Sequence, residues 1–203
     1  TATRCGRFSI SHRGLSVLFL TQTYPRSAVD SAGPFIRDLA RALVRGGDRV
    51  RVLLPSGPDV PARWTEQGVE AVSFRYAPRR FEVLGYGRSL RADEATRPTA
   101  MLVTPAYLRA ARRRLLRELA AETWDLVHAH WVVPNGLAAT AAASRVPLAI
   151  GLHGSDVFLA ERRFVRALVG GVLRRTSVMT ACSPELAQRV ERLGLPAGRS
   201  HVI

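Results

Sequence analysis

The stretch A-I-G-L-H-G-S-D at residues 149–156 decides how the rest of the chain is interpreted. An apolar run ends at His153, and a glycine, a serine and an aspartate follow at once. This pattern predicts a buried parallel strand at 147–152 that runs out into a loop at its carboxyl end. Ligands of open α/β sheets bind just outside such carboxyl ends, so His153 and Asp156 are candidate site residues.

Apolar strand segments alternate with helical segments on both sides of this stretch, as in a doubly wound α/β sheet. The strands are expected at residues 15–20, 49–54, 69–75, 125–129, 147–152 and 177–181, with a seventh beginning at 201. The helices are expected at residues 34–45, 102–122, 134–144, 158–175 and 184–193. We therefore predict a parallel sheet of six or seven strands in one Rossmann-like domain over residues 15–203, after a flexible tail at residues 1–14.

The composition favours anionic partners. The net charge is +14, and all 30 basic residues are arginine, which favours phosphates, acidic lipids or nucleic acid. No aromatic residues alternate with the arginines at 112–114, so we expect no nucleic acid partner. The arginines of the 102–122 helix, together with Phe81, Leu84 and Tyr86 of the irregular segment 76–99, instead predict a peripheral contact with an anionic membrane surface.

The two cysteines, Cys5 and Cys182, form no disulfide framework, which is typical of a reducing compartment. The apolar runs are shorter than the roughly 18 residues that a membrane-spanning helix needs. Residues 1–14 hold no apolar stretch of signal-peptide length. We therefore expect a cytoplasmic protein, in peripheral contact with the inner face of the membrane.

Gly33 is the first candidate binding residue. It precedes Pro34 at an expected helix start, where bare backbone N–H groups can approach a phosphate. The alternative is a simple turn glycine. The sequence contains neither the dinucleotide-binding pattern nor the Walker pattern, so both of those nucleotide fingerprints are excluded.

Three histidines stand at the ends of two expected strands. A neutral His153 can hydrogen-bond a sugar hydroxyl or polarise a reacting group, and Asp156 can accept from a hydroxyl or cap the next helix. The alternative for His153 is a structural histidine bonded to the backbone. A three-histidine zinc site with His128 and His130 is conceivable, but no cysteine or carboxylate is spaced to complete it. We expect instead that His128 lies inside the sheet, and that His130 and Trp131 line a polar cleft at its edge.

Four motifs follow one another along the chain: G-P-F-I-R-D-L-A-R-A-L-V-R-G-G-D-R-V-R-V-L at 33–53, D-L-V-H-A-H-W at 125–131, L-H-G-S-D at 152–156 and M-T-A-C-S at 179–183. Over residues 15–203, their order and spacing resemble the N-terminal domain of family 4 glycosyltransferases, which are retaining enzymes of the GT-B fold. The resemblance implies that this domain forms the acceptor side of an interdomain cleft. It implies that His153 is catalytic and acts on the donor sugar, and that Gly33 lies near the donor diphosphate. The implied substrates are a nucleotide sugar and an acceptor, with no cofactor and no metal required.

The sequence departs from the family pattern in three places and in length. The first loop holds Ala32 before Gly33 where many members have two glycines, Asp48 replaces a histidine, and Gly151 replaces a common threonine. We expect the last two changes to be peripheral. In the family a C-terminal domain holds most of the donor, so we interpret the chain as half an enzyme that is inactive alone. The alternatives are a non-catalytic Rossmann-like binding module and half of another GT-B enzyme, such as a nucleotide-sugar epimerase.

Overall fold

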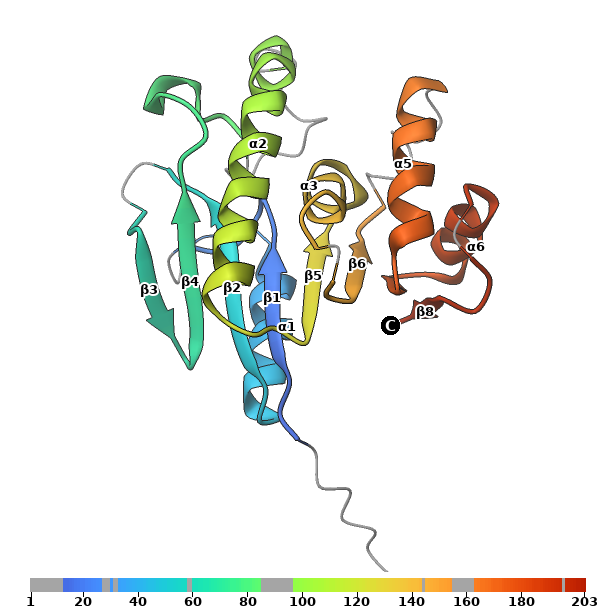
Figure 1. Ribbon diagram of the computed structural model, residues 1–203, viewed down its shortest axis with the longest axis horizontal. Coiled ribbons are helices and arrows are strands. Elements are labelled where there is room, and N and C mark those ends of the chain that lie inside the picture. Colours follow the sequence, from blue (N-terminus) through green and yellow to red (C-terminus); the bar gives the residue numbers. More distant parts are fainter. Residues whose placement is uncertain are drawn as a thin grey trace, which may run out of the picture.

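Eight strands form one sheet in the computed structural model, which describes residues 13–26, 30, 33–57, 60–84, 97–143, 145–154, 163–194 and 196–203. The strands are β1 (Ser16–Leu20), β2 (Arg49–Pro55), β3 (Arg63–Glu66), β4 (Val69–Phe74), β5 (Leu126–His130), β6 (Leu148–Leu152), β7 (Val178–Ala181) and β8 (Ser200–Val202). Their order across the sheet is β3-β4-β2-β1-β5-β6-β7-β8 (Figure 1). Every neighbouring pair is parallel except β3 and β4.

Helices cover both faces of the sheet, so the predicted doubly wound, Rossmann-like fold is confirmed (Figure 1). The described helices are α1 (Pro34–Arg45), α2 (Arg97–Ala121), α3 (Leu137–Thr140), α5 (Arg163–Arg175) and α6 (Pro184–Arg192), with two short turns, η1 (Arg79–Phe81) and η2 (Val132–Gly136). The helix α1 buries Ile36 and Ala40 against one face, on Phe19 and Val52. The helices α2, α3, α5 and α6 pack on the other face, around a second apolar cluster that includes Tyr107.

The sequence predictions of strands and helices differ from the structure in detail. The sheet has eight strands rather than six or seven, and β3 is antiparallel, because the sequence R-W-T-E of this edge strand is polar and half exposed and carries no strand signal. Gln67 and Gly68 join β3 to β4 as a two-residue hairpin turn with φ of 48° and 81°. The helix expected at 134–144 is shorter than predicted, because the residues up to Gly136 belong to the turn η2 and the regular helix α3 covers only Leu137–Thr140. Residues 1–12, most of the predicted tail, lie outside the described residues.

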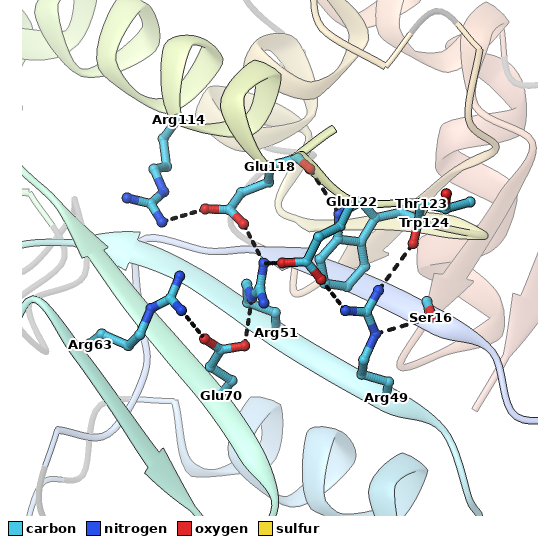
Figure 2. Close-up of polar contacts among 10 residues, drawn as sticks. All are labelled: Ser16, Arg49, Arg51, Arg63, Glu70, Arg114, Glu118, Glu122, Thr123 and Trp124. Atoms are coloured by element: carbon cyan, nitrogen blue, oxygen red, sulfur yellow. Dashed lines mark hydrogen bonds and ion pairs between the residues drawn. The ribbon is translucent and has the colours of Figure 1, made fainter. Parts of the chain in front are cut away.

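A buried ion-pair network ties the amino-terminal half of β2 to the end of α2 (Figure 2). Arg51 is 6% exposed, and its Nη1 donates to Glu118 Oε2 at 2.5 Å and to Glu122 Oε1 at 2.6 Å. Its Nε donates to Glu70 Oε2 on β4 at 2.7 Å. One guanidinium therefore joins two strands and a helix, on the part of the sheet away from the carboxyl ends of the strands.

A second layer of side chains surrounds this centre. Arg49 pairs with Glu122, and its guanidinium lies 4.2 Å from the ring centroid of Trp124. Arg63 on β3 pairs with Glu70 at 2.9 Å, and Arg114 pairs with Glu118. Hydrogen bonds from Arg51 and Arg49 lower the pKa of Glu122, so this carboxylate is ionised at neutral pH.

Candidate functional site at the carboxyl edge of the sheet

The carboxyl ends of β5 and β6 and the start of α1 bring three predicted site residues to one edge of the sheet. His130 is the last residue of β5 and lies in register with Gly151 of β6, and His153 follows β6 directly. Gly33 precedes α1, where the ring centroid of Phe35 lies 4.7 Å from that of His153. The prediction that Gly33, His130 and His153 share one edge is therefore confirmed.

Three imidazole rings form a column at this edge. The centroids of His128 and His130 are 4.3 Å apart, with 29° between the ring planes. The centroids of His130 and His153 are 5.3 Å apart, with 21° between the planes, and His130 Nδ1 lies 3.1 Å from His153 Nε2. The edge of the Phe19 ring packs against both His128 and His130, with centroids 5.0 Å apart in each case.

Gly151 makes room for this histidine column. A Cβ atom at position 151 would lie 2.9 Å from His130 Nδ1, 3.2 Å from His128 Nε2 and 3.4 Å from His153 Nε2. Any larger side chain would displace the rings, because real Cβ atoms essentially never approach so closely. The sequence alone suggests that the replacement of the common threonine by Gly151 is peripheral. The structure instead places Gly151 directly against the three histidine rings.

Burial keeps the column neutral at physiological pH. Desolvation lowers the pKa of His153 to about 4, lowers that of His128 to about 4, and lowers that of His130 well below its usual value. His128 is 7% exposed and lies inside the sheet, as predicted. Within the described ranges, no group of three or more His, Cys, Asp or Glu side chains is arranged to hold a metal ion, so the zinc alternative has no support there.

Two aromatic side chains stand beside His153. The Trp131 ring centroid lies 4.5 Å from that of His153, and the Phe35 centroid lies 6.4 Å from that of Trp131. Phe35 remains 48% exposed, although the next residue, Ile36, is fully buried. The sequence signal that marks Phe35 is an apolar residue outside the helical repeat of Ile36, Ala40 and Leu43. The two rings are inclined by 61° to each other and offer apolar surface at the rim, next to a neutral imidazole.

The turn after β5 is fixed by Asn135, a residue that sequence reasoning missed. Asn135 is fully buried, donates from Nδ2 to the His130 carbonyl oxygen at 2.8 Å and to Gln22, and accepts from the Tyr107 hydroxyl at 2.7 Å. The Trp131 N–H donates to the Gly151 carbonyl oxygen at 2.9 Å. These bonds hold the turn against β1, β6 and α2, and so fix the direction of both His130 and Trp131.

Gly33 has two reasons to be glycine. Its φ of 66° is in the left-handed region, which disfavours other residues. A Cβ atom there would also lie 3.1 Å from the Thr23 carbonyl oxygen. The Ile36 N–H donates to the Gly33 carbonyl oxygen at 3.0 Å, so the first turn of α1 begins at this edge of the sheet.

Three further residues, Asp156, Ser183 and His130, complete the description of this edge. Asp156 lies outside the described residues. The Ser183 hydroxyl accepts from the Leu186 N–H at 3.2 Å and caps α6. The predicted cleft residue His130 is only 1% exposed, and its ring reaches His153.

Comparison with known proteins shows which family the chain resembles. Residues 32–203 match the family model described as Glycosyltransferase Family 4. A search of curated protein sequences finds no match.

Several solved structures share the fold. Sucrose-phosphate synthase from Thermosynechococcus elongatus is 12% identical with a TM-score of 0.63, over 93% of this chain and 87% of that chain. Anabaena HepE, solved in complex with UDP and glucose, is 20% identical with a TM-score of 0.53, over 93% of this chain and 44% of that chain. Starch Synthase IV from Arabidopsis thaliana, bound to ADP and acarbose, is 14% identical with a TM-score of 0.56, over 94% of this chain and 51% of that chain. The chain therefore spans about half the length of the last two.

Proposed function

The chain belongs to glycosyltransferase family 4, and on this premise we propose that it forms the acceptor side of the cleft in a retaining enzyme. The enzyme transfers a sugar from a nucleotide-sugar donor to an acceptor. The observation that carries the proposal is the position of a neutral His153 beside the start of α1 at the carboxyl edge of the sheet. The exposed aromatic surface of Phe35 next to His153 supports the acceptor side as the role of this edge.

The proposed reaction breaks the bond between the anomeric carbon and the donor diphosphate. The anomeric carbon gains positive character, and the leaving diphosphate gains negative charge. Backbone N–H groups at the start of α1, next to Gly33, stabilise this charge. The departing phosphate takes the proton of the acceptor hydroxyl, whose oxygen bonds to the same face of the anomeric carbon, so the configuration is retained.

His153 hydrogen-bonds the donor sugar as the transition state forms. Trp131 and Phe35 line the acceptor side, and Asp156 remains a predicted contact to a substrate hydroxyl. His130, which is buried, acts through its contact with His153. These groups position and polarise the substrates, and none of them forms a covalent bond in the proposed reaction.

We also propose a second domain that binds most of the donor. The support is that this chain spans 44% of HepE and 51% of Starch Synthase IV, whose structures hold UDP with glucose, and ADP with acarbose. Closure of two domains would exclude water and protect the activated sugar from hydrolysis.

The test is a panel of nucleotide sugars and acceptors offered to the natural full-length gene product. We expect the variant His153→Ala to lower turnover by about 10²–10³, the loss typical of one positioned hydrogen bond to a transition state. Melting temperature and nucleotide affinity should change little. The matched control is His201→Ala on β8, an exposed histidine two strands away from β6, which should keep wild-type turnover.

Product analysis separates the alternatives. A glycosylated acceptor supports a transferase, whereas an altered sugar with no acceptor product supports an epimerase. Tight nucleotide-sugar binding without any product supports a binding module. Wild-type turnover by His153→Ala, or a loss explained by unfolding, would contradict the site assignment.

A further proposal concerns an anionic membrane surface at the inner face of the membrane. In the first turns of α2, Met101 is 69% exposed and Leu102 is 78% exposed, and Phe81 in η1 is 37% exposed. The Arg80 guanidinium lies 4.8 Å from the Phe81 ring centroid. The first turns of α2 extend beyond the carboxyl ends of the strands (Figure 1). Apolar side chains flanked by arginines are typical of an interfacial contact with anionic lipid.

Basic side chains continue from this tip along α2. Four arginines of this helix are exposed: Arg109, Arg112, Arg113 and Arg117. Arg112 donates to the Ala141 carbonyl oxygen, and Arg175 of α5 donates to the neighbouring Thr140 carbonyl oxygen, so the basic face spans three helices. Among the residues that the structure describes, none of the helices is both long and apolar enough to cross a bilayer.

A further inference from the structure

We propose that His130 is a positioning residue: its Nδ1–H donates a hydrogen bond to Nε2 of His153 and thereby fixes the proton of His153 on Nδ1. The catalytic consequence rests on the proposed function, whereas the position of the proton does not. The inference starts from the separation of 3.1 Å between His130 Nδ1 and His153 Nε2.

Only one proton lies between these two nitrogens. His130 is 1% exposed, and burial lowers the pKa of both rings well below neutral pH. Two neutral imidazoles in contact need one N–H and one lone pair, because each neutral ring has one donor and one acceptor nitrogen. The remaining question is which ring donates.

The other nitrogen of His130 decides the direction. His130 Nε2 is buried and has no hydrogen-bond partner among the described residues. A proton on Nε2 would leave a buried N–H without an acceptor, which is rare in native proteins and costs its full desolvation. With the proton on Nδ1, the donor nitrogen of His130 is satisfied by His153, and the buried Nε2 carries only a lone pair.

The packing around His130 holds its ring in this orientation. His128 stacks on one side at 4.3 Å between centroids, and the Phe19 ring packs against both rings. Asn135 holds the His130 carbonyl oxygen at 2.8 Å, so the backbone under the ring is also fixed. Gly151 leaves the space in which the two nitrogens meet.

The consequence is a defined chemical role for His153. Its Nε2 accepts from His130, so its Nδ1 carries the proton and acts as a hydrogen-bond donor. A neutral N–H donor can bond a sugar hydroxyl or an oxygen that gains negative charge, and no proton needs to be transferred. His153 is therefore a donor rather than a general base in the proposed reaction.

The first experiment measures the proton position directly, by long-range ¹H–¹⁵N NMR correlation on this chain labelled with ¹⁵N-histidine at neutral pH. Protonated and bare ring nitrogens have well-separated ¹⁵N shifts. We expect Nδ1 protonated and Nε2 bare for both His130 and His153, with the signals assigned by their loss in His130→Asn and His153→Ala. A protonated Nε2 on His153 would overturn the proposal. The exposed His201 provides the reference for a ring in contact with solvent.

The second experiment uses matched variants of His130. Asparagine can place an amide N–H near the position of Nδ1, whereas leucine fills the space without a donor. In the full-length enzyme, His130→Leu should lower kcat by about 10- to 100-fold, by analogy with the loss seen when a metal-bound histidine loses its orienting partner, and His130→Asn should recover most of it. KM should change little in both variants.

The two proposals fail in different ways. Equal losses in His130→Leu and His130→Asn at matched melting temperatures would contradict the positioning role. If no sugar transfer is found for the wild-type enzyme, the proposed function fails, and the NMR result still decides where the proton lies.

Discussion

At the residue scale, the burial of His128 makes the free energy of unfolding depend on pH. Burial lowers its pKa to about 4, whereas an unfolded chain has a histidine pKa of about 6.5. Between these values the unfolded chain binds a proton that the folded chain rejects, so stability is full above pH 6.5 and is lost as the pH falls toward 4. We expect this residue to lower the free energy of unfolding by on the order of 2 kcal/mol across that window. Urea unfolding at a series of pH values measures the change.

The control for this prediction is His128→Phe, which keeps an aromatic ring but cannot be protonated. Its stability should fall less between pH 6.5 and 4 than that of the wild-type chain, and an unchanged pH dependence would contradict the prediction. In contrast to His153→Ala, the truncation His128→Ala should cost stability more than turnover, by about 2–4 kcal/mol, because it leaves a cavity inside the sheet.

The sequence predicts those site residues that stand at the ends of strands or are glycines. Gly33, His130 and His153 share an edge because the carboxyl ends of parallel strands meet there. Phe35 and Asn135 were missed, because their roles depend on contacts with residues far away in the sequence: His153 for Phe35, and Tyr107 and Gln22 for Asn135. Its place outside the helical repeat marks Phe35 as an unusual apolar residue, but no local pattern reveals its contact with His153 or marks Asn135.

At the scale of the elements, the Arg51 network connects β2, β4 and α2. Arg51→Ala should lower the free energy of unfolding by about 3–5 kcal/mol, because the buried Glu118 would keep only Arg114, and Glu70 and Glu122 would lose their bonds to the same guanidinium. Arg63→Ala is the matched control. It breaks the pair with Glu70 from a guanidinium that is 56% exposed, and should cost about 1 kcal/mol or less. Urea unfolding at pH 7 measures both, and equal losses would contradict the central role of Arg51.

The basic face of α2 leads to a second prediction at this scale. The chain should bind vesicles of anionic lipid weakly in a sedimentation assay, and added salt should weaken the binding because exposed charges are screened. The double variant Arg109→Glu/Arg113→Glu should abolish it. Arg45→Glu, at the exposed end of α1 on the other face of the sheet, should not. Equal binding to neutral vesicles would reject the proposed electrostatic contact.

The strands and helices of the chain differ in how well the sequence predicts them. Buried parallel strands such as β1 and β6 are continuous apolar runs, and their positions follow from that pattern. The edge strand β3 forms because a hairpin turn at Gln67 and Gly68 brings a polar segment back along β4, and this pairing has no hydrophobic signature. The helix α2 begins at Arg97, before the expected residue 102, because Pro98 is tolerated in a first turn.

At the scale of the whole molecule, the chain spans about half of HepE and of Starch Synthase IV. We predict that residues 1–203 alone transfer no sugar from any nucleotide sugar, because most donor contacts belong to the proposed second domain. The measurement is release of nucleoside diphosphate in the presence of candidate acceptors, with the full-length gene product as the positive control. Measurable turnover by the 203-residue chain would show that this domain binds and activates the donor by itself.

Gly151 also determines how the site can change by mutation. Because a Cβ atom there would lie 2.9 Å from His130 Nδ1, the effect of a substitution at 151 depends on which residue occupies position 130. We expect a threonine at 151 to be harmful while His130 is present, and to become acceptable once a smaller residue replaces His130. The two positions should therefore show epistasis, and a library that varies either one alone would miss the sequences in which both have changed.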